Sequence, residues 1–246
     1  MNGLPAVKGF IETSFVDWAG KVASVVFLPR CNFSCPYCHN HRLVNDPESY
    51  RTFALDEVLE RMEALRGWLD GVTVTGGEPT VHRELPSLLK IFRDRGWQVK
   101  LDTNGSNPAM LGELVTGGLV SAVSLDVKAP LEEIPYRRNA GRGADPSAVR
   151  RSLEIIARSG LPAELRTTVH PSLLSVAEMA RIITQTSEIF GGYKTIKWQA
   201  CQVSDTLDHS LSKTGAPDRE VLSRLVSEAE ELAKTSGHLT EGGPTS

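Results

Sequence analysis

The sequence predicts an α/β domain built on a parallel sheet, and three observations lead to this prediction. Short runs rich in apolar and β-branched residues alternate along the chain with segments of helical periodicity. Several of these runs are almost continuously apolar, as expected for strands that are covered on both faces. The composition is that of an ordinary globular protein, with 40% hydrophobic and 23% charged residues among 246. A chain of this length buries a sizeable core without disulfide or metal staples.

Six segments carry the strand pattern. They cover residues 23–28, 72–75, 98–102, 122–127, 164–169 and 195–200. Parallel neighbours need a crossover connection, and such crossovers are right-handed. Six strands that alternate with helices therefore form either a sheet that closes as a barrel or an open, doubly wound sheet. Periodicity alone does not decide between the two.

Five segments repeat apolar residues at helical spacing and are expected to pack one face against the sheet. They cover residues 55–65, 85–92, 149–157, 176–190 and 218–234. Gly96 and Gly160 follow two of these segments and are expected to end their helices. The stretches 136–146 and 204–216 are expected to be irregular loops.

We expect one domain over residues 1–235 and a loose tail over 236–246, which is rich in Gly, Ser, Thr and Pro. The formal net charge of −3 gives no reason to expect a nucleic-acid or membrane partner. No apolar run approaches the roughly 20 residues of a membrane helix, and the N-terminus lacks the apolar core of a signal peptide. The expected location is therefore cytoplasmic.

The cysteines point to a metal site. Cys31, Cys35 and Cys38 directly follow the first predicted strand, and one loop of this spacing can wrap three thiolates around a single centre. Soft thiolate ligands select zinc or an iron–sulfur cluster. Three protein ligands would leave one iron of a four-iron cluster open to substrate or cofactor. The alternative is a structural zinc site in which His39 or His41 supplies the fourth ligand, although the spacing fits paired zinc motifs poorly.

A second motif follows the second predicted strand, where the chain reads Gly76, Gly77, Glu78 and Pro79. Two glycines at the end of a strand allow another group to approach the backbone closely. Exposed backbone N–H and C=O groups at such a point can pair with a small polar ligand, for example an amino acid. The alternative is a simple glycine-rich turn.

Together, CxxxCxxC after one strand and GGEP after the next resemble the radical S-adenosylmethionine (SAM) superfamily, and Tyr37 matches the aromatic position of that family's motif. The resemblance implies a 4Fe–4S cluster on the three cysteines, with the amino and carboxylate groups of SAM on the open iron. It implies that the Gly-Gly-Glu segment binds the SAM amino group and that Tyr37 lies near adenine. It also implies a single-domain, partial (βα)6 TIM-like barrel, which agrees with the six predicted strands.

A narrower resemblance is to glycyl-radical-enzyme activating enzymes, especially activating proteins of anaerobic ribonucleoside-triphosphate reductase. It rests on segments 100–108, 124–130 and 206–208, and on 17–21 with Trp18 and Ala19 in place of Tyr and Pro. The resemblance implies an oxidoreductase that cleaves SAM to a 5′-deoxyadenosyl radical and installs a glycyl radical on a partner enzyme. A flavodoxin- or ferredoxin-like protein would donate the electron, and no side chain need act as a conventional acid or base.

Charged residues at strand ends are further candidates. Asp102 ends the third predicted strand, while Asp126 and Lys128 end the fourth and lie two apart, so they share a face. In a barrel all three lie at the C-terminal mouth, where barrel active sites are found. We expect Lys128 to pair with the SAM carboxylate. The resemblance implies that the two acids, with Thr103, hold the cofactor or a monovalent cation; the alternative is a structural ion pair.

Four other residues carry less specific expectations. Asn104 is a candidate cofactor residue, again with a structural alternative. Arg166 resembles a cofactor-contacting position of activating enzymes, but a buried arginine also needs an acidic partner. His170 either contacts substrate or is an ordinary loop residue. Cys201 either faces the cavity or, as we favour, packs as a small apolar group.

Three functions therefore remain open on the sequence. The first is an activating enzyme with a protein substrate. The second is a radical enzyme acting on a small molecule, resembling 7-carboxy-7-deazaguanine synthase. The third is a protein without catalytic activity that carries electrons on an iron–sulfur cluster or binds zinc.

Overall fold

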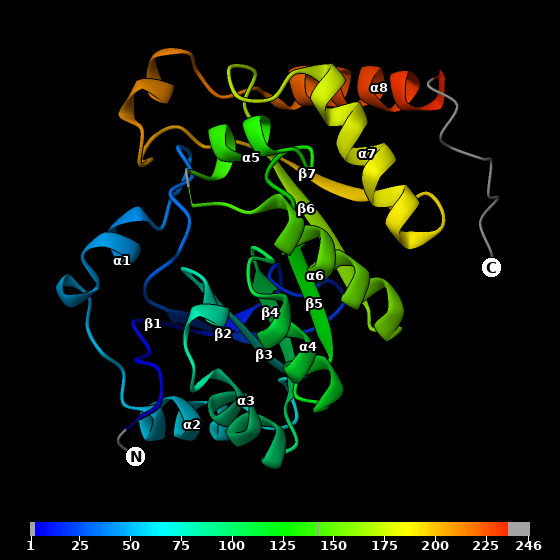
Figure 1. Cartoon of the computed structure of the whole chain (residues 1–246). Helices are drawn as coiled ribbons and strands as arrows, with labels where there is room; N and C mark the ends of the chain where they lie inside the picture. The colour runs from blue at the N-terminus through cyan, green and yellow to red at the C-terminus, as the bar shows by residue number, and fades with distance from the viewer. Residues whose placement is uncertain (1–2, 142, 236–246) are drawn as a thin grey trace.

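The computed structural model describes residues 3–141 and 143–235, so the predicted tail lies outside the described residues. The strands form one seven-stranded sheet (Figure 1). They are β1 (Gly9–Ser14), β2 (Ala23–Leu28), β3 (Gly71–Gly76), β4 (Gln98–Thr103), β5 (Ala122–Asp126), β6 (Ala163–Val169) and β7 (Ile196–Ala200). All six predicted strands are present within one residue or two of their expected bounds.

The described residues also form eight α-helices and three short 3₁₀ turns, of which η3 and α8 follow the last strand. The helices are α1 (His41–Asn45), α2 (Leu55–Ala64), α3 (Leu85–Asp94), α4 (Pro108–Thr116), α5 (Glu133–Ala140), α6 (Pro146–Ser159), α7 (Val176–Phe190) and α8 (Arg219–Thr235). The 3₁₀ turns are η1 (Pro47–Ser49), η2 (Pro79–Val81) and η3 (His209–Lys213). None of the helices in this part of the chain combines the length and apolar character that crossing a bilayer requires.

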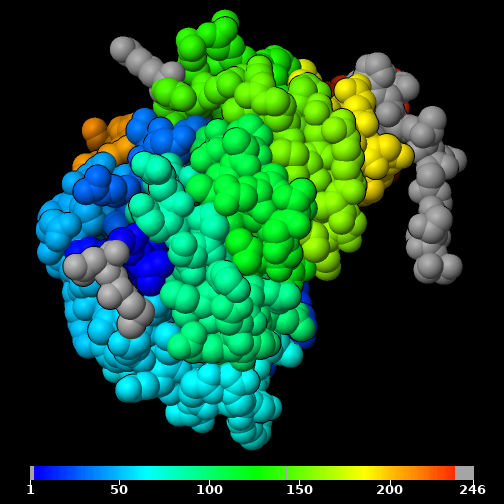
Figure 2. All heavy atoms as spheres, turned by 60° about the horizontal axis from the view of Figure 1, so that its bottom comes forward, coloured from blue at the N-terminus to red at the C-terminus, as the bar shows by residue number. Residues whose placement is uncertain are grey.

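The strand order decides between a barrel and a doubly wound sheet. The strands lie in sequence order from β1 to β7, and each pair from β2 to β7 is parallel. Right-handed crossovers that always step to the next strand place their crossover helices on the same face of the sheet. The sheet then curls around its uncovered face, and β1 and β7 remain as separate edges. This confirms the partial barrel, and Figure 2 shows α2, α3, α4 and α6 side by side as its outer layer.

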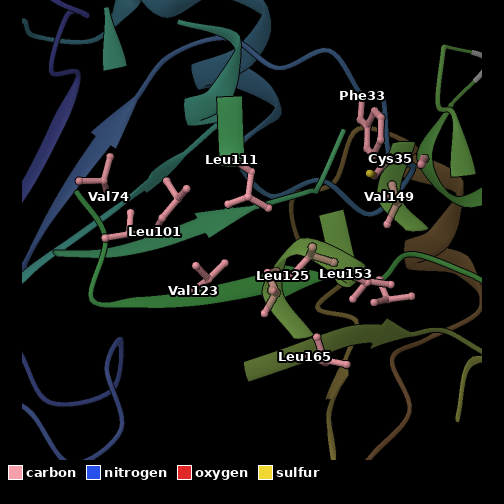
Figure 3. Packing of buried hydrophobic residues seen from close by; sticks show 14 of the residues in the cluster. Phe33, Cys35, Val74, Leu101, Leu111, Val123, Leu125, Val149, Leu153 and Leu165 are labelled. Carbon is pink, nitrogen blue, oxygen red and sulfur yellow. The ribbon is translucent and has the colours of Figure 1, made fainter. Parts of the chain in front are cut away.

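The main core lies between the sheet and this helical layer. Outward side chains of neighbouring strands, among them Leu101, Leu125 and Leu165, pack in one cluster with residues of α4 and α6 (Figure 3). The predicted helix over 176–190 is confirmed, and Gly160 ends α6 in a left-handed conformation at φ 70°. Phe33 and Cys35 belong to the same buried cluster, so the core extends into the cysteine loop.

Several predictions were wrong. Strand β1 was missed because it is an antiparallel edge strand with mostly exposed side chains, which carries no continuous apolar signal. Helix α4 was missed because it is short and contains a glycine, although a parallel β4–β5 pair demands a crossover element. The stretch 136–146 is not an irregular loop, since α5 covers its first half, and η3 lies inside the expected loop 204–216.

Candidate functional site

A pocket of about 320 Å³ opens at the carboxyl ends of the strands. Its lining contains every residue predicted from the sequence for cluster or cofactor binding. These are Cys31, Cys35, Tyr37, Cys38, Gly76, Gly77, Glu78, Asp102, Thr103, Asn104, Asp126, Lys128 and Arg166. The carboxyl ends of parallel strands meet at one edge of the sheet, which explains why motifs far apart in the sequence converge here.

The cysteine loop follows β2 and is held by one hydrogen bond within the loop and one to the end of α5. The backbone N–H of Cys38 donates to the carbonyl of Cys35 at 3.0 Å, and Ser34 N–H donates to the carbonyl of Ala140 at 2.9 Å, at the end of α5. Burial raises the pKa of all three thiols, that of Cys31 to about 11. Without a metal these thiols are therefore neutral at physiological pH. Metal coordination supplies the positive charge that stabilises their thiolates.

The donor set fits an iron–sulfur cluster better than zinc. Across residues 3–141 and 143–235, no three His, Cys, Asp or Glu side chains converge tightly enough to bind one metal ion. A structural zinc site needs such convergence, whereas a cluster binds each thiolate on a different iron. His41, one proposed fourth zinc ligand, is instead paired through Nε2 with Asp205 Oδ1 at 3.0 Å. His39 does line the pocket.

The two glycines bring the end of β3 against the chain that leads into the cysteine loop. Gly77 N–H donates to the carbonyl of Leu28 and Glu78 N–H donates to that of Arg30, both at 2.8 Å. A Cβ atom on Gly76 would collide with backbone atoms of Leu28, and one on Gly77 would collide with the carbonyl of Arg30. On the Cβ side the close approach that glycine allows is therefore made by protein backbone. Both glycines also line the pocket, so the approach of a ligand to their backbone stays a prediction.

Substituting Gly77 with alanine tests this close approach. Because backbone atoms cannot move aside as a side chain would, we expect a loss of about 3 kcal/mol in the free energy of unfolding, the upper end for overpacking. The control is Gly192→Ala, where no atom lies within 4 Å of the added methyl group. Urea unfolding of both variants measures the difference, and equal stabilities would show that the contact between the two loops is loose.

Glu78 connects β3 to β4 beneath the pocket. Its Oε1 accepts hydrogen bonds from Thr80 N–H at 3.0 Å and Thr103 Oγ1 at 2.7 Å, and its Oε2 accepts one from Asn104 N–H at 2.6 Å. Burial raises the pKa of Glu78, against the opposing effect of these donors. The Glu78 carboxylate therefore accepts most of its hydrogen bonds from protein donors, and these bonds join the loop after β3 to the end of β4. The Gly77 carbonyl, in contrast, accepts no hydrogen bond from any described residue.

Five charged side chains form a continuous line of alternating sign across the inside of the sheet, which we call the charge chain. Lys100 Nζ donates to Asp102 Oδ1 at 2.6 Å, and Arg166 donates to Asp102 Oδ2 at 2.9 Å and Asp126 Oδ1 at 2.7 Å. Lys128 Nζ donates to Asp126 Oδ2 at 3.1 Å. The ion pair expected between Asp126 and Lys128 is present, whereas Asp102 pairs with Lys100 and Arg166 rather than with Lys128. The acidic partners expected for a buried Arg166 are present as well.

The charge chain reaches the pocket at its Lys128 end. Lys128 lies 5.8 Å from the centre of the Tyr37 ring and lines the pocket. Burial opposes its charge, but Asp126 raises the pKa of Lys128 well above its usual value. Burial also opposes the charge of Asp126, which on its own would raise the pKa of this carboxyl. The positive charges of Arg166 and Lys128 outweigh burial and hold the pKa of Asp126 far below its usual value. The pocket therefore keeps a cation at every physiological pH.

Sequence reasoning missed two contributors, Lys100 and Asn32, and did not foresee the contact of Asn104 with Cys31. Lys100 extends the charge chain, Asn104 Nδ2 donates to the Cys31 sulfur at 3.8 Å, and Asn32 Oδ1 orients the same amide at 3.1 Å. A usable signal existed for Lys100, because Lys100 and Asp102 are two apart on a strand, as Asp126 and Lys128 are. No comparable signal marked the Asn32–Asn104 pair, which is separated by 72 residues.

His170 and Cys201 do not line the pocket. His170 is buried, bonds the Gly215 carbonyl through Nε2 at 3.1 Å and pairs through Nδ1 with Ser172 Oγ at 2.7 Å. It anchors the segment before α8 to the end of β6. Cys201 is buried in the core, as favoured from the sequence.

A family model described as the Radical SAM superfamily matches residues 25–183. A protein of Methanocaldococcus jannaschii, provisionally named as a glycyl-radical enzyme activating enzyme, is 26% identical over 230 residues, which cover 89% of each chain. A 7-carboxy-7-deazaguanine synthase of Neisseria meningitidis is 32% identical over 90 residues, 37% of this chain and 39% of that protein. The structure of Escherichia coli coproporphyrinogen III oxidase (HemN), a radical SAM enzyme, has a TM-score of 0.58 at 16% identity. The match covers 87% of this chain and 52% of the oxidase chain, and it shows that the two proteins share a fold.

Proposed function

The chain belongs to the radical SAM superfamily, and from this premise we propose that it is an activating enzyme that installs a glycyl radical on a partner protein. The observation that carries the proposal is the end-to-end match, over 89% of each chain, with a relative provisionally named for that activity. The match with a small-molecule radical enzyme spans only 37% of this chain. We assign the activity to the single domain expected over residues 1–235.

The family implies a 4Fe–4S cluster and SAM, and the residues present fit both. We propose that Cys31, Cys35 and Cys38 hold three irons of the cluster. Asn104 Nδ2, which contacts the Cys31 sulfur, then donates a hydrogen bond to a cluster ligand and so tunes the cluster. Held there, the cluster would supply the one-electron chemistry of the reaction: reduction of SAM would break a carbon–sulfur bond, release methionine and leave a 5′-deoxyadenosyl radical.

The chain's own groups orient SAM. We assign the Gly77 carbonyl to the SAM amino group and the Lys128 ammonium to its carboxylate, because a carbonyl that accepts no hydrogen bond from a described residue and a cation line the same pocket. Tyr37 is buried and its hydroxyl has no hydrogen-bond partner in the described structure, so we place it against adenine. Geometry carries the specificity, since a primary carbon radical attacks whatever C–H bond lies closest.

The proposal omits a monovalent cation between Asp102 and Asp126. Arg166 already donates to one oxygen of each carboxylate, and the lysines of the charge chain occupy the others. A cation would have to displace one of these partners. The positive charge between the acids is therefore assigned to Arg166.

The partner and the electron donor complete the proposal. The hydrogen donor is a backbone glycine of a glycyl radical enzyme, for which anaerobic ribonucleoside-triphosphate reductase is the first candidate. The electron comes from a flavodoxin- or ferredoxin-like protein. The alternative of a small-molecule substrate is supported by the partial match with 7-carboxy-7-deazaguanine synthase.

The test has two stages under anaerobic conditions. Protein reconstituted with iron and sulfide is incubated with SAM and dithionite, and 5′-deoxyadenosine is measured; no product would exclude radical SAM catalysis. The enzyme is then mixed with the glycyl radical enzyme of its source organism. We expect a glycine-centred doublet by electron paramagnetic resonance. Nucleoside product without that doublet would favour the small-molecule alternative.

A further inference from the structure

Lys100 is a buried cation that the proposed reaction does not use. It is 4% exposed, lies on β4 two residues before Asp102, and does not line the pocket. Its Nζ makes two hydrogen bonds, to Asp102 Oδ1 at 2.6 Å and to the backbone carbonyl of Asp17 at 2.8 Å. Burying an ammonium is unfavourable unless it is paired and hydrogen-bonded, so both partners are needed to hold it there.

Asp17 belongs to the loop between β1 and β2, residues 15–22, which we call the base loop. At its start, Ser14 Oγ at the end of β1 donates to Asp17 Oδ2 and accepts from Asp17 N–H at 3.3 Å. Trp18 is buried against Ala23 and Ala122, the first residues of β2 and β5. The base loop therefore closes the amino end of the strands, opposite the pocket, and turns the Asp17 carbonyl towards Lys100.

The charge chain joins this closed end to the pocket. It holds three cations and two carboxylates, so one positive charge remains uncompensated, and each internal member is bonded on both sides. Lys100 is fixed by the base loop, whereas in the described structure the Lys128 ammonium donates one side-chain hydrogen bond, to Asp126. The register that sets Asp126 opposite Arg166 on β5 and β6 makes the central link rigid.

We propose that Lys100 is a positioning residue, which acts through Asp102, Arg166 and Asp126 to set where the Lys128 ammonium lies in the pocket. Without Lys100, one oxygen of Asp102 loses its partner, the carboxylate rotates, and Arg166 follows it away from Asp126. Lys128 then loses its fixed acceptor. The inference rests on the proposed function only in naming the SAM carboxylate as the group that Lys128 meets.

The test compares Lys100→Met with a matched control, Lys197→Met. Lys197 on β7 also pairs with a carboxylate, Glu164 at 3.3 Å, but its pair is not part of the charge chain. For Lys100→Met we expect SAM to bind the cluster-loaded protein about tenfold more weakly, within the range of coupling inside one ion-pair network. For Lys197→Met we expect affinity within twofold of the wild type.

A second readout does not need the cofactor. In the full-length, cluster-free chain with ¹⁵N-labelled lysine, the Lys128 ammonium resonance should shift in Lys100→Met and stay in place in Lys197→Met. If Lys100 only stabilises the fold, unfolding shifts to lower denaturant while the SAM affinity and this resonance stay unchanged, which overturns the inference. Movement of only one of the two readouts also overturns it.

Ser14→Ala serves if Lys100→Met does not fold. It loosens the turn that presents the Asp17 carbonyl and should move both readouts in the same direction by a smaller amount, about twofold to threefold in affinity. A wild-type protein that does not bind SAM would refute the proposed function. The resonance alone then decides whether Lys100 positions Lys128.

Discussion

Replacing Cys35 with alanine should remove the iron–sulfur cluster and abolish 5′-deoxyadenosine formation. Cys35 is buried and is one of the three cysteines that line the pocket. Among the described residues, no group of His, Asp or Glu side chains lies close enough to replace it as a metal ligand. Iron and sulfide per chain should fall from about four each to about zero. Metal analysis with the visible absorption spectrum measures this change.

The matched control is Cys201→Ala, which removes the fourth cysteine without touching the pocket. It should keep its full iron content and its activity, at a modest loss of stability from one small core cavity. A wild-type protein that binds a single Zn(II) with four side chains, or a Cys35→Ala variant that keeps four irons, would contradict the assignment of the cluster to these three cysteines.

Replacing Arg166 with methionine should give the largest loss of stability among the pocket substitutions considered. The guanidinium is the only described partner of one oxygen of Asp102 and of one oxygen of Asp126. Its removal leaves two carboxylates partly unpaired in a buried site, which costs about 3–5 kcal/mol. Arg61→Met is the control, because Arg61 also bridges two carboxylates, Glu12 and Glu57 at 2.8 Å, but on the surface. There we expect about 1 kcal/mol or less.

The difference between Arg166→Met and the wild type should depend on pH. The pKa of Asp126 is lowered in the native state, chiefly because Arg166 and Lys128 outweigh the effect of burial. A lowered native pKa stabilises the fold above the unfolded pKa of about 4, and this contribution disappears as the pH falls through the native value. The stability gap should thus be full at pH 7 and shrink below about pH 4. A gap that is constant from pH 7 to pH 3 would show that Asp126 does not depend on Arg166.

Local patterns were enough to predict much of this molecule. The strand over residues 23–28 and the helix over 176–190 were predicted to the residue, because apolar runs and periodic faces express burial directly. The three cysteines and the Gly-Gly-Glu segment were found in the same way, because each motif lies within a few consecutive residues. Strand β1 was not predicted because it is an exposed edge strand. Helix α4 was not predicted because it is a short crossover helix that only the sheet topology requires.

The sequence by itself determined the donor groups of the site, namely three thiols, a glycine-rich strand end and charged residues at strand ends. Only the tertiary structure decided what each group touches. Arg166 lies 64 and 40 residues from the acids that it joins, and these contacts exist because parallel register sets β6 beside β5. The side-chain space of Gly77 is filled by the chain before Cys31, and His41 is paired with a residue 164 positions away. The spacing of residues along the chain determines which chemical groups a motif contains. Pairing across strands determines which charges lie close together, because charges interact through space.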